Sequence, residues 1–254
     1  MDQVVDGDTL KLANGRLVRL QGINAPELYH TQIHREPGSN AVTPQPLARE
    51  ARDALQDLLS QHLLLPQSTR VGLIFLHADR DIPQDKYGRL LALVVNDQQQ
   101  LLNQALIRQG LAWHVALEDS PYLHCLQEAE QQAKNNNLGI WALTVYQPVD
   151  SEKIQHLASG FQEVRGQIAS ISKSSKHVWL ELEGFVVLRL EPDVFRVLKQ
   201  KLMRKKSEGS DIIARGWLTE RAGQSSAKHA RQQKSVQRKP FIMPIRHISM
   251  LFLS

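Results

Sequence analysis

The chain has 254 residues, 42% of them hydrophobic and 22% charged, which is enough apolar material for folded cores and excludes a disordered chain. Its formal net charge is +5, from 31 Lys and Arg against 26 Asp and Glu, and no apolar run approaches the roughly 18 residues that a transmembrane helix needs. The single cysteine, Cys125, excludes an intramolecular disulfide, and without a Cys/His cluster it also excludes a zinc module.

The first half of the chain opens with a predicted β-hairpin. Two short alternating apolar runs, 9–12 and 17–20, flank a tetrapeptide with Asn-Gly at its centre, which is a strong hairpin signal. A polar loop is predicted over 29–46, then a helix over 47–65, strands over 70–77 and 89–96, and helices over 101–109 and 120–135. Because strands and helices do not alternate regularly, we expect an α+β fold built on an antiparallel sheet or barrel.

Three segments of this half carry groups suited to phosphate chemistry. The run Val4-Val5-Asp6-Gly7-Asp8-Thr9 supplies carboxylates, 19–27 supplies an arginine, amides and a carboxylate, and Asp85-Lys86-Tyr87-Gly88-Arg89 supplies a second arginine and a tyrosine. Oxygen ligands suit a hard cation such as Ca²⁺, and paired arginines can clamp a phosphate. Each segment alone is better explained as an ordinary turn or loop, so the prediction depends on their occurring together.

In their order and spacing these segments resemble the staphylococcal nuclease (thermonuclease) family. The elements that match are D-G-D-T at 6–9, R-L-x-G-I-x-A-P-E at 19–27, D-K-Y-G-R at 85–89, L-N-Q-A-L-I-R-Q-G-L-A at 102–112 and L-G-I-W at 138–141. The resemblance covers roughly the first 145 residues. It implies an OB-type five-stranded barrel with three helices, in agreement with the predicted order of elements.

The resemblance implies a catalytic role for Arg19, Glu27 and Arg89. Glu27 would act as the general base on the water that attacks the phosphodiester, and the two arginines would stabilise the charge that develops on the phosphate. Lys86 and Tyr87 match the positions that contact a terminal phosphate, and the products would carry 3′-phosphate ends.

The same resemblance implies a Ca²⁺ site formed by Asp8, the side chain of Asn24 and the backbone carbonyl of Ala25. The family commonly has Asp where this chain has Asn24, so the site lacks one negative charge and we expect a lower Ca²⁺ affinity. The family's nucleotide-binding tyrosine is replaced by alanine, at position 116, which leaves Trp113 or Tyr122 as candidates for base stacking.

A domain boundary is predicted between 145 and 160, where Pro, Asp, Ser and Gly gather. Beyond it we expect strands at 163–172, 177–183, 185–190, 211–220 and 241–253, with a helix at 193–204 after the third strand. Five strands with a helix in that position are typical of an OB-fold barrel. We therefore expect a catalytic domain over 1–147 and a mainly β, OB-fold-like domain over 160–254, with Trp141, Trp179 and Trp217 in the cores.

The two halves differ in charge. Residues 1–150 contain 12 basic and 17 acidic residues, a balance of −5, whereas residues 151–254 contain 19 and 9, a balance of +10. This asymmetry predicts that the second domain binds a polyanion, here nucleic acid. The candidate binding residues are Arg204, Lys205, Lys206, Lys228, Arg231, Lys234, Arg238 and Lys239.

The sequence thus predicts a Ca²⁺-assisted nuclease acting on DNA or RNA, with a second domain that holds the nucleic acid. A catalytically inactive nucleic-acid-binding protein built on the same two folds is the alternative. No obligate protein partner is evident, and the sequence does not define the oligomeric state. No export signal is visible at the start of the chain, so we expect a cytoplasmic protein, or an exported one if a segment upstream is missing.

Overall fold

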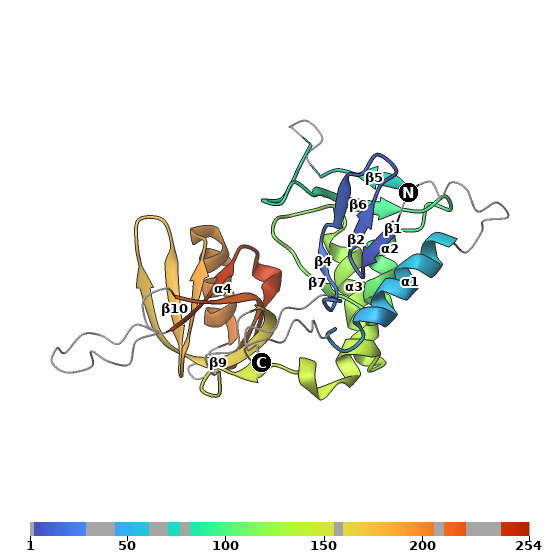
Figure 1. The fold of residues 1–254 in the computed structure, drawn as a ribbon. Coiled ribbons are helices and arrows are strands. Elements are labelled where there is room, and N and C mark those ends of the chain that lie inside the picture. The colour runs from blue at the N-terminus through green and yellow to red at the C-terminus, as the bar shows by residue number, and fades with distance from the viewer. Residues whose placement is uncertain are drawn as a thin grey trace, which may run out of the picture. The chain divides into compact units, whose positions relative to one another are not determined.

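The computed structural model describes residues 3–28, 44–60, 71–76, 82–154, 160–205, 211–221 and 240–253 (Figure 1). The chain divides into two compact units. The first comprises Met1–Val115 and Asp119–Thr144, and the second comprises Ala116–Glu118 and Val145–Ser254. None of the helices in the described ranges has the length and apolar character that a membrane span needs.

The first unit is built on a five-stranded sheet with the order β1-β2-β3-β6-β5. Its strands are β1 (Gln3–Asp6), β2 (Thr9–Lys11), β3 (Leu17–Leu20), β5 (Gly72–Ile74) and β6 (Leu90–Val95). Neighbouring strands are antiparallel except for the parallel pair β3 and β6. The predicted hairpin is confirmed, since β2 pairs with β3 and Thr9 lies opposite Arg19. A further pair, β4 (Ile23–Asn24) with β7 (Trp113–His114), is too short to leave a pattern in the sequence.

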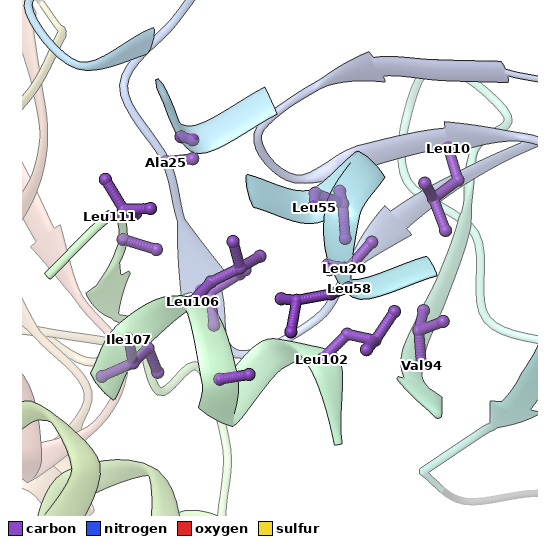
Figure 2. Close-up of a cluster of buried hydrophobic side chains, with 14 of the residues drawn as sticks. Leu10, Leu20, Ala25, Leu55, Leu58, Val94, Leu102, Leu106, Ile107 and Leu111 are labelled. Atoms are coloured by element: carbon purple, nitrogen blue, oxygen red, sulfur yellow. The ribbon is translucent and has the colours of Figure 1, made fainter. Parts of the chain in front are cut away.

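The first unit also contains three α-helices, α1 (Ala48–Ser60), α2 (Leu102–Arg108) and α3 (Leu123–Asn135), followed by the 3-10 turns η1 (Gly139–Ala142) and η2 (Thr144–Tyr146). Helices α1 and α2 pack against the sheet, and α3 packs against α2 and β7. The predicted helices are confirmed, although 61–65 lie outside the described residues. Figure 2 shows the core, where Leu55 and Leu58 of α1 meet Leu102 and Leu106 of α2 and Leu20 of β3. The first unit is thus the α+β fold that the sequence predicts.

The second unit contains a closed barrel of five strands. They are β9 (Gly160–Lys173), β10 (Val178–Leu182), β11 (Val186–Leu190), β12 (Asp211–Glu220) and β13 (Phe241–Ile245), with α4 (Pro192–Lys205) after the third. Neighbours are antiparallel except β11 and β13, and the pairing of β12 with β9 closes the barrel. The short strands β8 (Val149–Asp150) and β14 (Leu251–Leu253) extend the sheet beside β9 and β12. This arrangement is consistent with the predicted OB-type barrel.

Two further predictions are wrong, one about a strand of the second half and one about three tryptophans. The single strand expected over 241–253 is broken after β13 by the 3-10 turn η3 (Ile248–Met250), because His247 accepts a hydrogen bond from the Ser249 N–H and caps that turn. Trp141 and Trp179 are only partly buried, and Trp217 keeps 41% of its surface exposed, so none of the three is a fully buried core residue.

Candidate active site

The turn between β1 and β2 buries a carboxylate. Asp8 is only 3% exposed, and its backbone N–H donates to Asp6 Oδ1 at 3.0 Å. A side chain at Gly7 would lie 2.7 Å from the Cβ atoms of Ala25 and Ala51, which is closer than van der Waals contact permits. Glycine at this position therefore allows α1 and the segment after β4 to close over the turn.

The Asp8 carboxylate accepts three polar contacts. Its Oδ2 lies 2.7 Å from Arg19 Nη1 and accepts a 2.8 Å hydrogen bond from the Ala25 backbone N–H, while its Oδ1 accepts one of 3.2 Å from the Thr9 hydroxyl. Arg19 reaches Asp8 because it lies opposite Thr9 across the β2–β3 pair. Residues from β2, from β3 and from the segment after β4 thus converge on one buried carboxylate.

Asn24 brings a second oxygen to the same guanidinium. Arg19 Nη2 donates to Asn24 Oδ1 at 3.0 Å, and Arg19 Nη1 also donates to the Leu20 carbonyl at 3.2 Å. The Asn24 amide in turn donates to the Ala25 carbonyl at 3.3 Å. Oxygens of Asp8 and Asn24 therefore contact Arg19, and the Ala25 carbonyl lies beside the Asn24 amide.

Burial raises the pKa of Asp8 to about 8, from an ordinary value of 3.8. The Arg19 charge and the Ala25 N–H lower the pKa, but the nearby carboxylates of Asp6 and Glu27 raise it. The negative charge of Glu27 therefore acts on the protonation of Asp8, although the Glu27 side chain is exposed. A cation in this region would favour the ionised form of Asp8.

Two hydrogen bonds to Gln45 fix the backbone of Glu27. The Glu27 N–H donates to Gln45 Oε1 at 2.7 Å, and the Gln45 N–H donates to the Glu27 carbonyl at 3.0 Å. These two hydrogen bonds clamp the ends of the segment 28–44, most of which lies outside the described residues. Gln45 therefore fixes the backbone from which the Glu27 carboxylate projects.

The turn before β6 presents the second arginine. Arg89 Nε lies 2.7 Å from Asp85 Oδ2, and Arg89 Nη1 donates to Thr9 Oγ1 at 3.5 Å. Partial burial alone would raise the pKa of Asp85, but hydrogen bonds from the side chain and N–H of Arg89 and the N–H of Tyr87 hold it below its ordinary value. Because Thr9 also donates to Asp8, it links the two arginines through the buried carboxylate.

Lys86 and Tyr87 lie in the same turn as Asp85. Tyr87 is 71% exposed, with the Lys86 ammonium 4.9 Å and the Arg89 guanidinium 5.6 Å from its ring centre. The structure thus places the positive charges of Lys86 and Arg89 next to the Tyr87 phenol. That combination suits a phosphate group.

The donor set fits a hard cation. Asp8, Asn24 and Ala25 offer a carboxylate, an amide and a carbonyl oxygen, which is the chemistry that Ca²⁺ prefers. Only one of them carries a negative charge, and within the described ranges no group of three or more His, Cys, Asp or Glu side chains forms a metal cluster. These residues supply the oxygen types that Ca²⁺ prefers, and in this structure the Asp8 and Asn24 oxygens contact the Arg19 guanidinium.

The predicted residues Asp8, Arg19, Asn24 and Ala25 are thus in contact with one another. Thr9 connects Arg89 to this group, and the Glu27 carboxylate is close enough to raise the pKa of Asp8. Trp113 is 4% exposed, so it presents no free ring face for base stacking. In the second unit Arg204 and Lys205 end α4, while Lys206, Lys228, Arg231, Lys234, Arg238 and Lys239 lie outside the described residues.

Sequence reasoning assigned no role to three residues of this network: Thr9, Gln45 and Asp85. Thr9 and Asp85 belong to the quoted D-G-D-T and D-K-Y-G-R elements, so their place in the motifs was a usable signal. Gln45 has no such signal, because a polar segment of 17 residues separates it from Glu27 in the chain.

The sequence of this chain is similar to those of known proteins. Residues 17–143 match the family described as staphylococcal nuclease homologue. Three proteins of Bacillus subtilis strain 168 are similar: the SPbeta prophage-derived endonuclease YokF, endonuclease YncB and endonuclease YhcR, at 31%, 30% and 31% identity over 151 residues.

The similarity covers 58%, 58% and 56% of this chain in the three cases. It covers 44% of YokF, 62% of YncB and 11% of YhcR, so each relative is longer than the part that it shares with this chain. The second unit lies almost wholly outside the family match. On the match over residues 17–143, the chain belongs to the staphylococcal nuclease homologue family.

Proposed function

We propose that this protein is a nuclease that hydrolyses phosphodiester bonds of DNA and RNA. The observation that carries the proposal is the link from Arg19 through Asp8 and Thr9 to Arg89, with the Glu27 carboxylate within electrostatic range of its centre. Two arginines and one exposed carboxylate are the groups that general-base attack on a phosphodiester needs. The similarity to three endonucleases supports the same reaction class.

Glu27 accepts a proton from the water that attacks phosphorus. Its side chain is exposed, as a group that meets both water and substrate must be, while Gln45 holds its backbone in place. Arg19 and Arg89 donate to the phosphate oxygens and stabilise the negative charge that develops there. Lys86 and Tyr87 bind a neighbouring phosphate of the chain.

Asp8, Asn24 and the Ala25 carbonyl would hold Ca²⁺ next to this phosphate. When bound, the ion supplies positive charge that offsets the charge developing on the phosphate oxygens. The proposal agrees with the cluster of oxygens around Arg19 and with the raised pKa of Asp8, which a cation would lower.

The test of this function is cleavage of single-stranded DNA with Ca²⁺ or with chelator, for the parent chain and for Glu27→Gln. Loss of the general base should slow cleavage by about 10²- to 10⁴-fold. Glu50→Gln is the matched control, because Glu50 is an exposed carboxylate on α1, in the same unit. A parent chain that binds but does not cleave would favour the inactive binding protein, and an unaffected Glu27→Gln would overturn the assigned base.

We also propose that the second unit holds the nucleic acid. Its balance of +10 contrasts with the −5 of the first half, and Lys and Arg contacts to phosphates supply most non-specific affinity for nucleic acid. An acidic catalytic half would otherwise repel its substrate. On this proposal residues 1–147 cut and residues 160–254 hold.

Salt dependence tests the holding role in the full chain. Replacing Lys228, Arg231 and Lys234 by Gln should reduce the slope of log K against log[salt] by up to about 2. Each phosphate contact of a single strand contributes about 0.7 to that slope. The control variant replaces three exposed arginines of the first half, Arg16, Arg49 and Arg108, by Gln. Equal slopes for the two variants would contradict a special role for the second unit.

A further inference from the structure

The outer face of the second barrel carries an aromatic ring and an arginine side by side. On β10, Val178, Leu180 and Leu182 are buried in the core, so the alternation of side chains directs Trp179 to the opposite face. Trp179 pairs with Arg189 on β11 and with Ser172 on β9, and Arg189 pairs with Pro244 on β13. These residues form one row across four strands, which we call the Trp179 row.

Arg189 in this row has an unsatisfied donor. Its Nε is buried, and among the described residues it finds no hydrogen-bond partner. Buried N–H groups of proteins are nearly always paired, so this guanidinium has unused donor capacity, and the Arg189 side chain as a whole is only partly buried. A phosphate oxygen is the acceptor that a guanidinium binds best.

A second arginine lies over the Trp179 ring. The Arg221 guanidinium carbon is 5.5 Å from the ring centre, and the Arg221 N–H donates to the Pro240 carbonyl at 2.8 Å. The basic segment 222–239 therefore begins and ends at Arg221 and Pro240, although that segment is outside the described residues and forms no part of the proposed site. A second positive charge thus lies next to Trp179, within the row.

The remaining neighbours show why stacking, rather than charge alone, would select the ligand. His177 meets the Trp179 ring edge-on at 6.1 Å, and its Nδ1 lies 3.6 Å from a Glu191 carboxylate oxygen. Glu181, two residues after Trp179, belongs to the same face of β10. Because two carboxylates accompany the two arginines, a purely electrostatic polyanion site is not what this face offers.

We propose that the Trp179 row is a binding platform for single-stranded nucleic acid, on which Trp179 stacks an unpaired base and Arg189 binds an adjacent phosphate. The proposal deepens the holding role of the second unit and rests on it. Stacking on an aromatic ring tolerates any base but requires that the base be unpaired, so duplex should bind more weakly. The exposed face of the second and third strands is also where OB-type barrels accommodate oligonucleotides.

Trp217 provides the contrast and the matched control. It belongs to the same unit and is 41% exposed, but its ring packs edge-on against Phe161, 4.9 Å away. The arginine two residues earlier on the same strand, Arg215, is fully buried and paired with Glu163. The Trp217 side chain is therefore exposed, but the arginine on its strand is buried and not available to bind a phosphate.

The test measures binding of a fluorescein-labelled 12-nucleotide single strand by anisotropy, in chelator, on the full chain carrying Glu27→Gln. Trp179→Ala should weaken binding between about fivefold and about a hundredfold, and Trp179→Phe by less than about threefold, since a ring is kept. Arg189→Gln should lower affinity and make the salt slope shallower by about 0.7. Trp217→Ala should stay within about twofold of the parent.

The affinity of Trp179→Ala should fall by similar factors for single-stranded DNA and for single-stranded RNA, because both offer unpaired bases. Parent-like binding by Trp179→Ala, equal losses for Trp179→Ala and Trp217→Ala, or tighter binding of the matched duplex would each overturn the platform. If Trp179→Ala does not fold, as judged by its thermal unfolding, Trp179→Phe and Arg189→Gln decide, and an unchanged Arg189→Gln overturns the proposal. Cleavage by the chain with Glu27 intact is measured separately, so failure of the nuclease function leaves the binding result standing.

Discussion

In the part of the chain that the structure describes, each unit buries an arginine–carboxylate pair, and the two pairs differ in their surroundings. Arg19 Nη1 lies 2.7 Å from Asp8 Oδ2, and Arg215 Nη2 lies 2.7 Å from Glu163 Oε1. Both carboxylates are nearly covered, with side chains 5% and 7% exposed. The distances alone would not reveal which of the two pairs belongs to a functional site.

The partners of each arginine make the difference. Arg215 directs both Nε and Nη2 to the same Glu163 oxygen, packs over the Phe252 ring and has no exposed surface. Arg19 is 12% exposed and divides its donors among Asp8, Leu20 and Asn24. The Arg215–Glu163 pair is closed to ligands because its arginine is fully covered, whereas Arg19 is partly exposed and can exchange its acceptor oxygens for those of a ligand.

The largest expected effect is on stability and comes from Arg215→Met. It leaves the Glu163 carboxylate buried without its partner, which should lower the free energy of unfolding by about 3–5 kcal/mol. Adding Glu163→Leu should restore most of that loss, because no buried charge then remains. Urea unfolding measures both variants, and a cost below about 1 kcal/mol for Arg215→Met would show that the pair is not structural.

Arg19→Lys should act mainly on catalysis. Lysine keeps the charge beside Asp8 but cannot reproduce the planar fork of the guanidinium, so cleavage should slow by about 10²- to 10³-fold. The loss of stability should be smaller than for Arg215→Met, since a positive charge still faces Asp8. Single-turnover cleavage and urea unfolding separate the two effects; normal cleavage by a strongly destabilised variant would reverse the comparison.

The pH dependence of Ca²⁺ binding should be the next largest effect. The pKa of Asp8 is raised to about 8 in the folded chain, so between about pH 4 and pH 8 the folded chain holds a proton that the unfolded chain has lost. The contribution of Asp8 to the free energy of unfolding therefore falls as pH rises through that window. Ca²⁺ needs the ionised carboxylate, so its apparent affinity should rise by up to about tenfold per pH unit and level off above pH 8.

Calorimetric titration with Ca²⁺ at pH 6, 7, 8 and 9 checks this expectation. Asp8→Asn should abolish the binding, and Glu163→Gln, which alters the other pair, should leave the slope unchanged. An affinity that does not vary between pH 6 and pH 8 would exclude a proton on Asp8.

The smallest expected effect comes from Asp85→Asn. The Asp85–Arg89 pair is only partly buried, with side chains 17% and 26% exposed, so its loss should cost about 0.2–1 kcal/mol at pH 7. Because the pKa of Asp85 is lowered in the folded chain, that stability is present above pH 4 and disappears as pH falls through the folded pKa. Urea unfolding at pH 7 and pH 3 should therefore show a smaller difference from the parent at pH 3, and a larger one there would contradict the pair.

The sequence by itself determined the elements whose patterns are local. The Asn-Gly turn predicts the hairpin of β2 and β3, and the spacing of Leu55 and Leu58 predicts α1, because neighbouring residues alone decide turn geometry and which helix face is apolar. The motifs likewise identified Arg19, Glu27 and Arg89, since each lies in a short segment of characteristic order.

Only the tertiary structure decided which of those residues meet, and how deeply they are buried. The hydrogen bond from Arg89 to Thr9 joins residues 80 positions apart, and that from Ala25 to Asp8 joins residues 17 apart. Burial raises the pKa of Asp8 because α1 and the segment after β4 close over its turn, and no local pattern encodes that packing. Trp179 shows the same limit, since a tryptophan in an alternating strand fits the core and the outer face equally well until the neighbouring strands assign the faces.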